Sequence, residues 1–132
     1  MTCNWKALAA EVIASLSHDE REESIAYLEQ RVISPGQALP IAGITQRFDE
    51  PVAIAFVDLE PSLNWTHRAR YLVLAAGGGV RRIINVDRPP FLKGVSQHLR
   101  LIHRGRRAPV WAVVTSPSAL TSPDNDPDGD EP

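Results

Sequence analysis

The spacing of apolar residues changes part-way along the chain, and this change limits the possible folds more than any other feature. Between Trp5 and Leu16 the apolar side chains recur every three or four residues, which is the period of an amphipathic helix. From Val52 onward they stand in short unbroken runs that are typical of buried strands. A chain of 132 residues with both patterns has the length of about one domain. The sequence therefore predicts an α+β fold.

The first 34 residues are predicted to form a segment of two helices. The first helix contains the apolar stripe that starts at Trp5. A second helix is expected after it, because Ser17 and Glu20 have the spacing of a capping box. The triplet Ser34-Pro35-Gly36 would end this helix. Its buried stripe would consist of Ile25, Leu28 and Val32.

Residues 35–51 contain three prolines and two glycines, and they are predicted to form a linker or a crossing loop. A short fourth strand is expected inside this segment, between Ile41 and Phe48. Three apolar runs follow, and Gly77-Gly78-Gly79 separates the last two of them. Because glycine adopts positive φ without strain, the triplet favours a hairpin turn. We therefore expect an antiparallel meander of the runs 52–57, 70–74 and 80–86.

A basic helix is predicted over residues 91–104, since apolar residues recur there at helical spacing and Gly105 would end it. The apolar run 110–114 is expected to add a final strand, in a mixed sheet with helices on one face. From residue 116 the chain is rich in Ser, Pro and Asp, which is typical of a disordered acidic tail. The predicted organisation is thus a two-helix segment (1–34), a linker or crossing loop (35–51), an α+β core (52–115) and a disordered acidic tail (116–132).

Charge is strongly segregated along the chain, although the formal net charge is only −2. Residues 1–34 carry three basic and six acidic side chains, whereas residues 47–107 carry eleven basic and five acidic ones. The tail from residue 116 has five acids and no base. Such an acidic–basic–acidic pattern indicates electrostatic partners.

Two further features of the sequence bear on location. Cys3 is the only cysteine, so the chain cannot form an internal disulfide, which fits a reducing compartment. The apolar runs are much shorter than the ~20 residues of a membrane helix. We therefore expect a cytoplasmic protein without a membrane partner.

The densest group of polar residues follows the first predicted strand, and loops at strand ends often carry functional residues. Asp87 ends the third predicted strand, and a meander would bring it near this loop. Carboxylates and an imidazole at one place could hold a metal ion. A turn that only connects two strands would use similar residues. The candidate catalytic residues are Asp58, Glu60, His67 and Asp87, and the candidate binding residues are Asn64, Trp65 and His67.

A second candidate site is basic. Six cationic side chains and no acid lie between Arg88 and Arg107. Such a row could contact the phosphates of a nucleic acid. It could equally contact an acidic protein or the acidic segments of the chain itself. The candidate binding residues are Lys93, Arg100, Arg104, Arg106 and Arg107.

Together these features favour a small non-catalytic interaction module that uses neither a metal nor a cofactor. Its partner would be another protein, an acidic one included, or a second copy of the chain. Two alternatives stay open. The first is a metal-dependent hydrolase or nuclease that uses the four candidate catalytic residues. The second is a nucleic-acid-associated accessory protein that binds through the basic helix.

Overall fold

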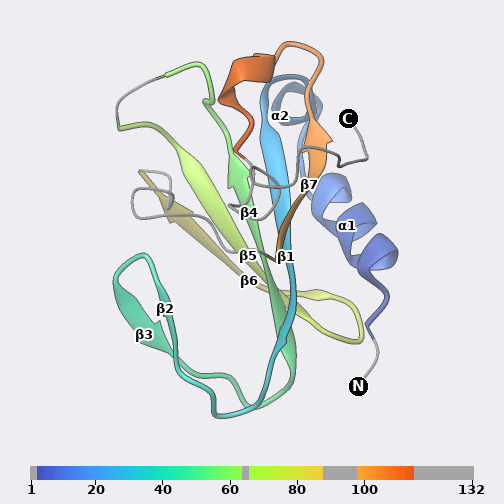
Figure 1. Cartoon of the computed structure of the whole chain (residues 1–132), viewed down its shortest axis with the longest axis vertical. Coiled ribbons are helices and arrows are strands. Elements are labelled where there is room, and N and C mark those ends of the chain that lie inside the picture. Colours follow the sequence, from blue (N-terminus) through green and yellow to red (C-terminus); the bar gives the residue numbers. More distant parts are fainter. Residues whose placement is uncertain (1–2, 64–65, 88–97, 115–132) are drawn as a thin grey trace, which may run out of the picture.

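The computed structural model describes residues 3–63, 66–87 and 98–114, and its main feature is a five-stranded antiparallel sheet (Figure 1). The strands lie in the order β6-β5-β4-β1-β7, and the hairpin β2-β3 forms a second, two-stranded sheet. The expected α+β class is therefore confirmed. The elements are α1 (Trp5–Ala14), α2 (His18–Glu23), β1 (Ile25–Ile33), β2 (Leu39–Ile41), β3 (Ile44–Gln46), β4 (Val52–Asp58), β5 (Ala69–Ala75), β6 (Val80–Val86), β7 (Leu99–Arg104) and the short 3-10 helix η2 (Val110–Ala112).

Helix α1 covers one face of the sheet, as its apolar stripe predicts. Its N-cap is Asn4, whose side chain accepts a hydrogen bond from the Ala7 amide at 3.0 Å. Leu8, Val12 and Leu16 are buried against the sheet. Neither α1 nor the other helices in the described part of the chain have the length and apolar character needed to cross a membrane. The sheet residues of this core include Ala26, Leu28, Ala53, Ala55, Val57, Leu72 and Leu74.

The predicted second helix is correct at its start and wrong beyond residue 23. The capping box forms, because the Ser17 hydroxyl accepts from the Glu20 amide at 3.2 Å. The Glu20 carboxylate in turn accepts from the Ser17 amide at 2.9 Å. Helix α2 ends at Glu23, however, and Ile25–Ile33 form strand β1.

Strand β1 takes the place of the predicted helix because its residues are buried on both sides. Ala26 and Leu28 pack on the α1 side of the sheet, whereas Ile25 and Tyr27 pack on the opposite face. A helix with a single apolar stripe would leave part of such a run exposed. Strand β1 also pairs with β4 along one edge and with β7 along the other. This long-range pairing outweighs the helical spacing of the apolar residues.

The predicted basic helix 91–104 is wrong in the part that the structure describes. Leu99–Arg104 form the edge strand β7, and residues 91–97 lie outside the described ranges. The first three residues of the strand alternate between apolar Leu99 and Leu101 and basic Arg100, which is the period of two that suits a strand. Every pair of neighbouring strands in the five-stranded sheet is antiparallel. The expected mixed sheet is therefore wrong.

The final strand predicted at 110–114 is also wrong, because Val110–Ala112 form η2. Strand β7 already occupies the edge of β1 that this run would need. The chain instead lies against the sheet face opposite α1, where the Val114 amide donates to the Tyr27 hydroxyl at 2.9 Å. The acidic tail predicted for 116–132 lies outside the described residues.

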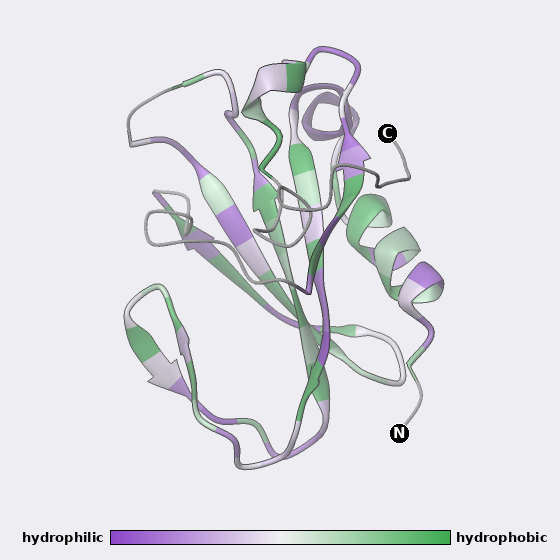
Figure 2. Cartoon of the chain, viewed as in Figure 1, coloured by the Kyte–Doolittle hydropathy of each residue, from purple (hydrophilic) through white to green (hydrophobic). Residues whose placement is uncertain are grey.

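The face of the sheet opposite α1 carries an aromatic core. Tyr27, Phe56 and Tyr71 lie side by side on neighbouring strands, with ring centroids 6.3 Å and 5.3 Å apart. The hairpin β2-β3 contributes the buried Ile41 to this face. The Arg82 guanidinium of β6 lies 5.7 Å from the ring centroid of Phe48, which follows the hairpin. In Figure 2 the central strands are largely green, the colour of hydrophobic residues, whereas α2 and the loop after β7 are purple, the colour of hydrophilic residues.

Helix α1 is fastened to the turn between β5 and β6 through Glu11. Gly78 and Gly79 of this turn have φ of +115° and +102°, values that favour glycine. Their conformation directs the Gly79 amide at the Glu11 carboxylate, and the donor–acceptor distance is 2.7 Å. The glycine triplet thus forms the predicted hairpin turn and also binds a side chain of α1.

Replacing Glu11 with alanine is expected to lower the free energy of unfolding by about 1–2 kcal/mol, since a charge-assisted hydrogen bond is lost. Glu11→Gln keeps an accepting oxygen and should lose less. Chemical denaturation of the three proteins measures the difference. Equal midpoints for Glu11→Ala and the wild type would show that the contact contributes nothing.

Candidate functional site

The polar loop of the sequence prediction lies between β4 and β5, and one pair of side chains closes it. The His67 Nε2 atom lies 2.9 Å from Asp58 Oδ1. Both residues are buried, with 7% of His67 and 9% of Asp58 exposed. Backbone hydrogen bonds hold the same end of the sheet, from the His67 amide to the Asp87 carbonyl at 2.8 Å and from Leu59 to Arg68 at 3.1 Å. The loop therefore starts and ends at a fixed point.

Asp58 experiences opposing electrostatic effects. Burial raises the pKa of its carboxyl, while the His67 imidazole and the Glu60 amide act to lower it. That amide donates to Asp58 Oδ1 at 3.1 Å. The imidazole and the Glu60 amide offset part of the cost of removing the carboxylate from water, and the geometry suits a buried pair that holds the loop.

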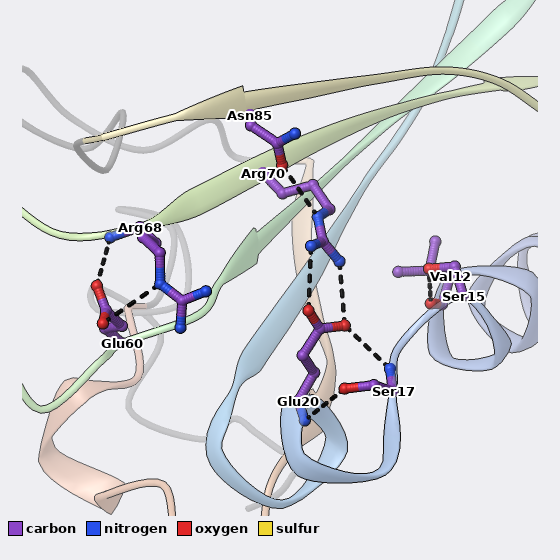
Figure 3. Close-up of polar contacts among 8 residues, drawn as sticks. All are labelled: Val12, Ser15, Ser17, Glu20, Glu60, Arg68, Arg70 and Asn85. Carbon is purple, nitrogen blue, oxygen red and sulfur yellow. Dashed lines mark hydrogen bonds and ion pairs between the residues drawn. The ribbon is translucent and has the colours of Figure 1, made fainter.

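Glu60 points to Arg68 instead of joining this pair. Its carboxylate accepts from the Arg68 amide at 2.6 Å and lies 3.4 Å from Arg68 Nε (Figure 3). The amide hydrogen bond is the main reason that the pKa of Glu60 is lowered. Asp87 approaches the loop through its backbone carbonyl. Of the four candidate catalytic residues, the structure shows a side-chain contact between Asp58 and His67.

The ranges 3–63, 66–87 and 98–114 contain no group of three or more His, Cys, Asp or Glu side chains that could hold a metal ion. Two candidate binding residues of the loop, Asn64 and Trp65, lie outside these ranges. Lys93 of the basic row lies outside them as well.

The basic candidates lie on β7 and on the turn that follows it. Arg100 donates to the Leu99 carbonyl at 3.0 Å. Arg104 donates to the Ala108 carbonyl at 2.7 Å and so closes the turn on itself. We refer to residues 104–107 as the basic turn. Its two outer arginines point away from the sheet core toward α2.

Helix α2 supplies the carboxylates that meet these two arginines. Arg106 donates to Glu22 through Nε at 3.0 Å and through Nη2 at 2.5 Å. Arg107 Nη1 lies 3.7 Å from the Glu23 carboxylate. The hydrogen bond from Arg106 is the main reason that the pKa of Glu22 is lowered. The sequence left open that the basic residues contact an acidic segment of the same chain. Arg106 and Arg107 make such a contact with α2.

Backbone contacts also join α2 to the basic turn. The Arg107 amide donates to the Glu22 carbonyl and the Gly105 amide donates to the Ser24 carbonyl, both at 2.8 Å. A Cβ atom at position 105 would lie only 2.3 Å from the Glu22 carbonyl oxygen, so only glycine fits this approach. The turn is thus held to α2 independently of the arginine side chains.

A second ion pair ties α2 to the sheet, and the sequence did not reveal it. Arg70 of β5 donates to both carboxylate oxygens of Glu20, at 3.2 Å and 3.1 Å (Figure 3). Arg70 Nε also donates to Asn85 of β6 at 3.4 Å. Glu20 therefore serves both the capping box and this bidentate pair, which lowers its pKa. These contacts hold α2 in place at this end of the sheet.

An apolar pair that the sequence placed in a buried strand is exposed instead. Val110 and Trp111 of η2 are each 68% exposed. The helix itself is anchored, because Ala112 and Val113 donate to carbonyls within it and Val114 donates to Tyr27. Pro109 is the N-cap residue of this turn. An anchored turn that presents a valine and a tryptophan to solvent is typical of a binding surface.

These features gather at one end of the sheet. In the strand register Ile25 pairs with Asp58 on one side and with Arg104 on the other. The β4-β5 loop, α2, the basic turn and η2 therefore meet at that end (Figure 1). Comparisons with protein-family models, with curated proteins and with solved structures gave no match.

Proposed function

We propose that the chain is a small non-catalytic interaction module that binds an acidic, apolar segment of a partner protein. The observation that carries this proposal is the exposure of Val110 and Trp111 on an anchored turn. Tryptophan side chains dominate the binding energy of many protein interfaces, because they bury a large area with few rotatable bonds. The end of the sheet that holds η2 would be the contact surface.

The charge beside this pair favours an acidic partner. Residues 98–114 contain four arginines and no acid. The basic turn precedes Val110 and Trp111 by only a few residues, so one short segment presents both cations and apolar side chains. A partner that alternates acidic and apolar residues complements both features. Leu63 of the β4-β5 loop, which is 48% exposed, would extend the apolar part of the surface.

The buried pair Asp58–His67 supports this surface by fixing the loop that carries Leu63. In this proposal the pair has a positioning role and touches no ligand. In this proposal the loop gives the surface its shape, and the arginines of the basic turn give it charge.

Binding of a fluorescent peptide of alternating glutamate and leucine, followed by anisotropy at low salt, tests the proposal. Trp111→Ala is expected to weaken binding about tenfold, which corresponds to about 1.4 kcal/mol. Ile44→Ala is the matched control, since Ile44 is 66% exposed at the far hairpin. It should leave the affinity unchanged. No binding by the wild type, or equal losses in the two variants, would refute the proposed function.

A further inference from the structure

We infer that α2 acts as an internal competitor for the basic turn, so that an acidic partner binds by taking the place of Glu22 and Glu23. This inference rests on the proposed function and concerns the regulation of the same surface. The two carboxylates form ion pairs with the guanidinium groups of Arg106 and Arg107. An acidic segment of a partner would need the same two groups. The competition is therefore built into the folded chain.

The ion pairs are accessible to such an exchange. The side chains of Arg106 and Arg107 are 73% and 62% exposed, so a partner can reach both guanidinium groups, whereas their carboxylate partners Glu22 and Glu23 are 22% and 56% exposed. Exposed ion pairs contribute little to stability, because water and salt screen them. A partner with several carboxylates can offer each arginine an equivalent contact and add the apolar contacts of η2.

The fold does not depend on these side-chain pairs to keep its shape. The backbone hydrogen bonds from Gly105 to Ser24 and from Arg107 to Glu22 remain when the guanidinium groups turn outward. The bidentate pair of Arg70 with Glu20 also holds α2 in place. Exchange of carboxylates on Arg106 and Arg107 can thus proceed on a fixed scaffold, without displacement of the helix.

The position of the two carboxylates along α2 is suited to this role. Glu22 and Glu23 are adjacent in sequence and meet two adjacent arginines, so the helix presents a short acidic segment to the basic turn. Glu20 of the same helix is committed to the sheet. Helix α2 therefore divides its acids between holding the helix and covering the basic turn.

The experiment compares the affinity of the full chain and of Glu22→Gln/Glu23→Gln for the alternating glutamate–leucine peptide at low salt. Removing the competitor is expected to tighten binding about five- to tenfold. The double variant Asp49→Asn/Glu50→Gln changes the net charge equally. These two acids precede Val52, which is the opposite end of β4 from Asp58, and Glu50 pairs there with Arg81. This variant should change the affinity by less than about twofold.

The outcomes separate the two proposals. Tight binding that is equal in the wild type and in Glu22→Gln/Glu23→Gln, yet lost in Trp111→Ala, would overturn the competitor role and leave the proposed function standing. No peptide binding in either protein would overturn both. Binding of a DNA duplex in place of the peptide would also overturn both, because the partner would then be a nucleic acid.

A measurement on the unaltered chain guards against a variant that fails to fold. The guanidinium signals of Arg106 and Arg107 in an NMR spectrum should shift on addition of the peptide, because Arg106 Nε and Arg107 Nη1 both change partners. The backbone amide signals of Gly105 and Arg107 should stay nearly constant. Arginine signals that stay constant while the peptide binds would contradict the exchange.

Discussion

Replacing His67 with alanine is expected to lower the free energy of unfolding by about 3 kcal/mol at neutral pH, because it leaves the buried Asp58 carboxylate without its imidazole partner. The loop between β4 and β5 would lose the contact that closes it. Chemical denaturation measures the loss. The double variant His67→Ala/Asp58→Asn provides the control, since it removes the buried charge together with its partner and should recover part of the stability.

The size of this loss should depend on pH in a defined direction. Burial raises the pKa of Asp58 above the ordinary aspartate value of 3.8, so the folded state favours the protonated form. A group with a raised pKa stabilises the fold at low pH, and this contribution disappears as the pH rises through the folded-state value. Without His67 the pKa of Asp58 rises further. The His67→Ala loss should therefore shrink on acidification, and a loss that grows instead would contradict the assignment.

Replacing Gly105 with alanine is expected to lower the free energy of unfolding by about 2–3 kcal/mol. The added methyl group would lie 2.3 Å from the Glu22 carbonyl oxygen and 2.5 Å from that of Arg21, both of which belong to the backbone of α2. Backbone atoms cannot rotate away as a side chain would. The basic turn must therefore move off the helix, which breaks the hydrogen bonds of Gly105 and Arg107.

Gly77→Ala is the matched control for this prediction. Position 77 lies in a turn as well, but a Cβ atom there would meet nothing within 4 Å. We expect its stability to stay within about 0.5 kcal/mol of the wild type. Thermal or chemical unfolding of both variants measures the difference. Equal stabilities for Gly105→Ala and Gly77→Ala would show that the close approach to α2 is not required.

The parts of the fold that could be predicted depend on residues close together in sequence. The strands β4, β5 and β6 follow one another and are joined by short connections, so their apolar runs and the glycine triplet suffice to define them. The capping box at Ser17 and Glu20 is likewise local. Strands β1 and β7 depend on pairing between residues 70 to 79 positions apart, from Glu29 with Leu99 to Ile25 with Arg104. Helical spacing in both segments concealed this pairing.

The candidate site divides in the same way. Asp58 and His67 stand at the two ends of one strand connection, so their contact could be predicted. The segregation of charge along the sequence suggested that the basic residues could contact an acidic segment of the same chain. The exposure of Trp111 could not be predicted from an apolar run alone. It depends on β7 having filled the edge of β1, which is a property of the whole sheet. The ion pairs of α2 also depend on the whole sheet, because Glu20 meets Arg70 of β5 while Glu22 and Glu23 meet the basic turn after β7.

The order of the strands also sets when the chain can complete its fold during synthesis. Strand β1 leaves the ribosome before both of its neighbours, β4 and β7, and β7 ends only at Arg104. Until then, Ile25, Tyr27 and Leu28 have no complete sheet to cover them. Contacts between such distant segments form slowly, since long loops must close first. A nascent chain that stops before Leu99 would keep β1, with its apolar residues Ile25 to Leu28, at an open edge, where another chain could pair with it.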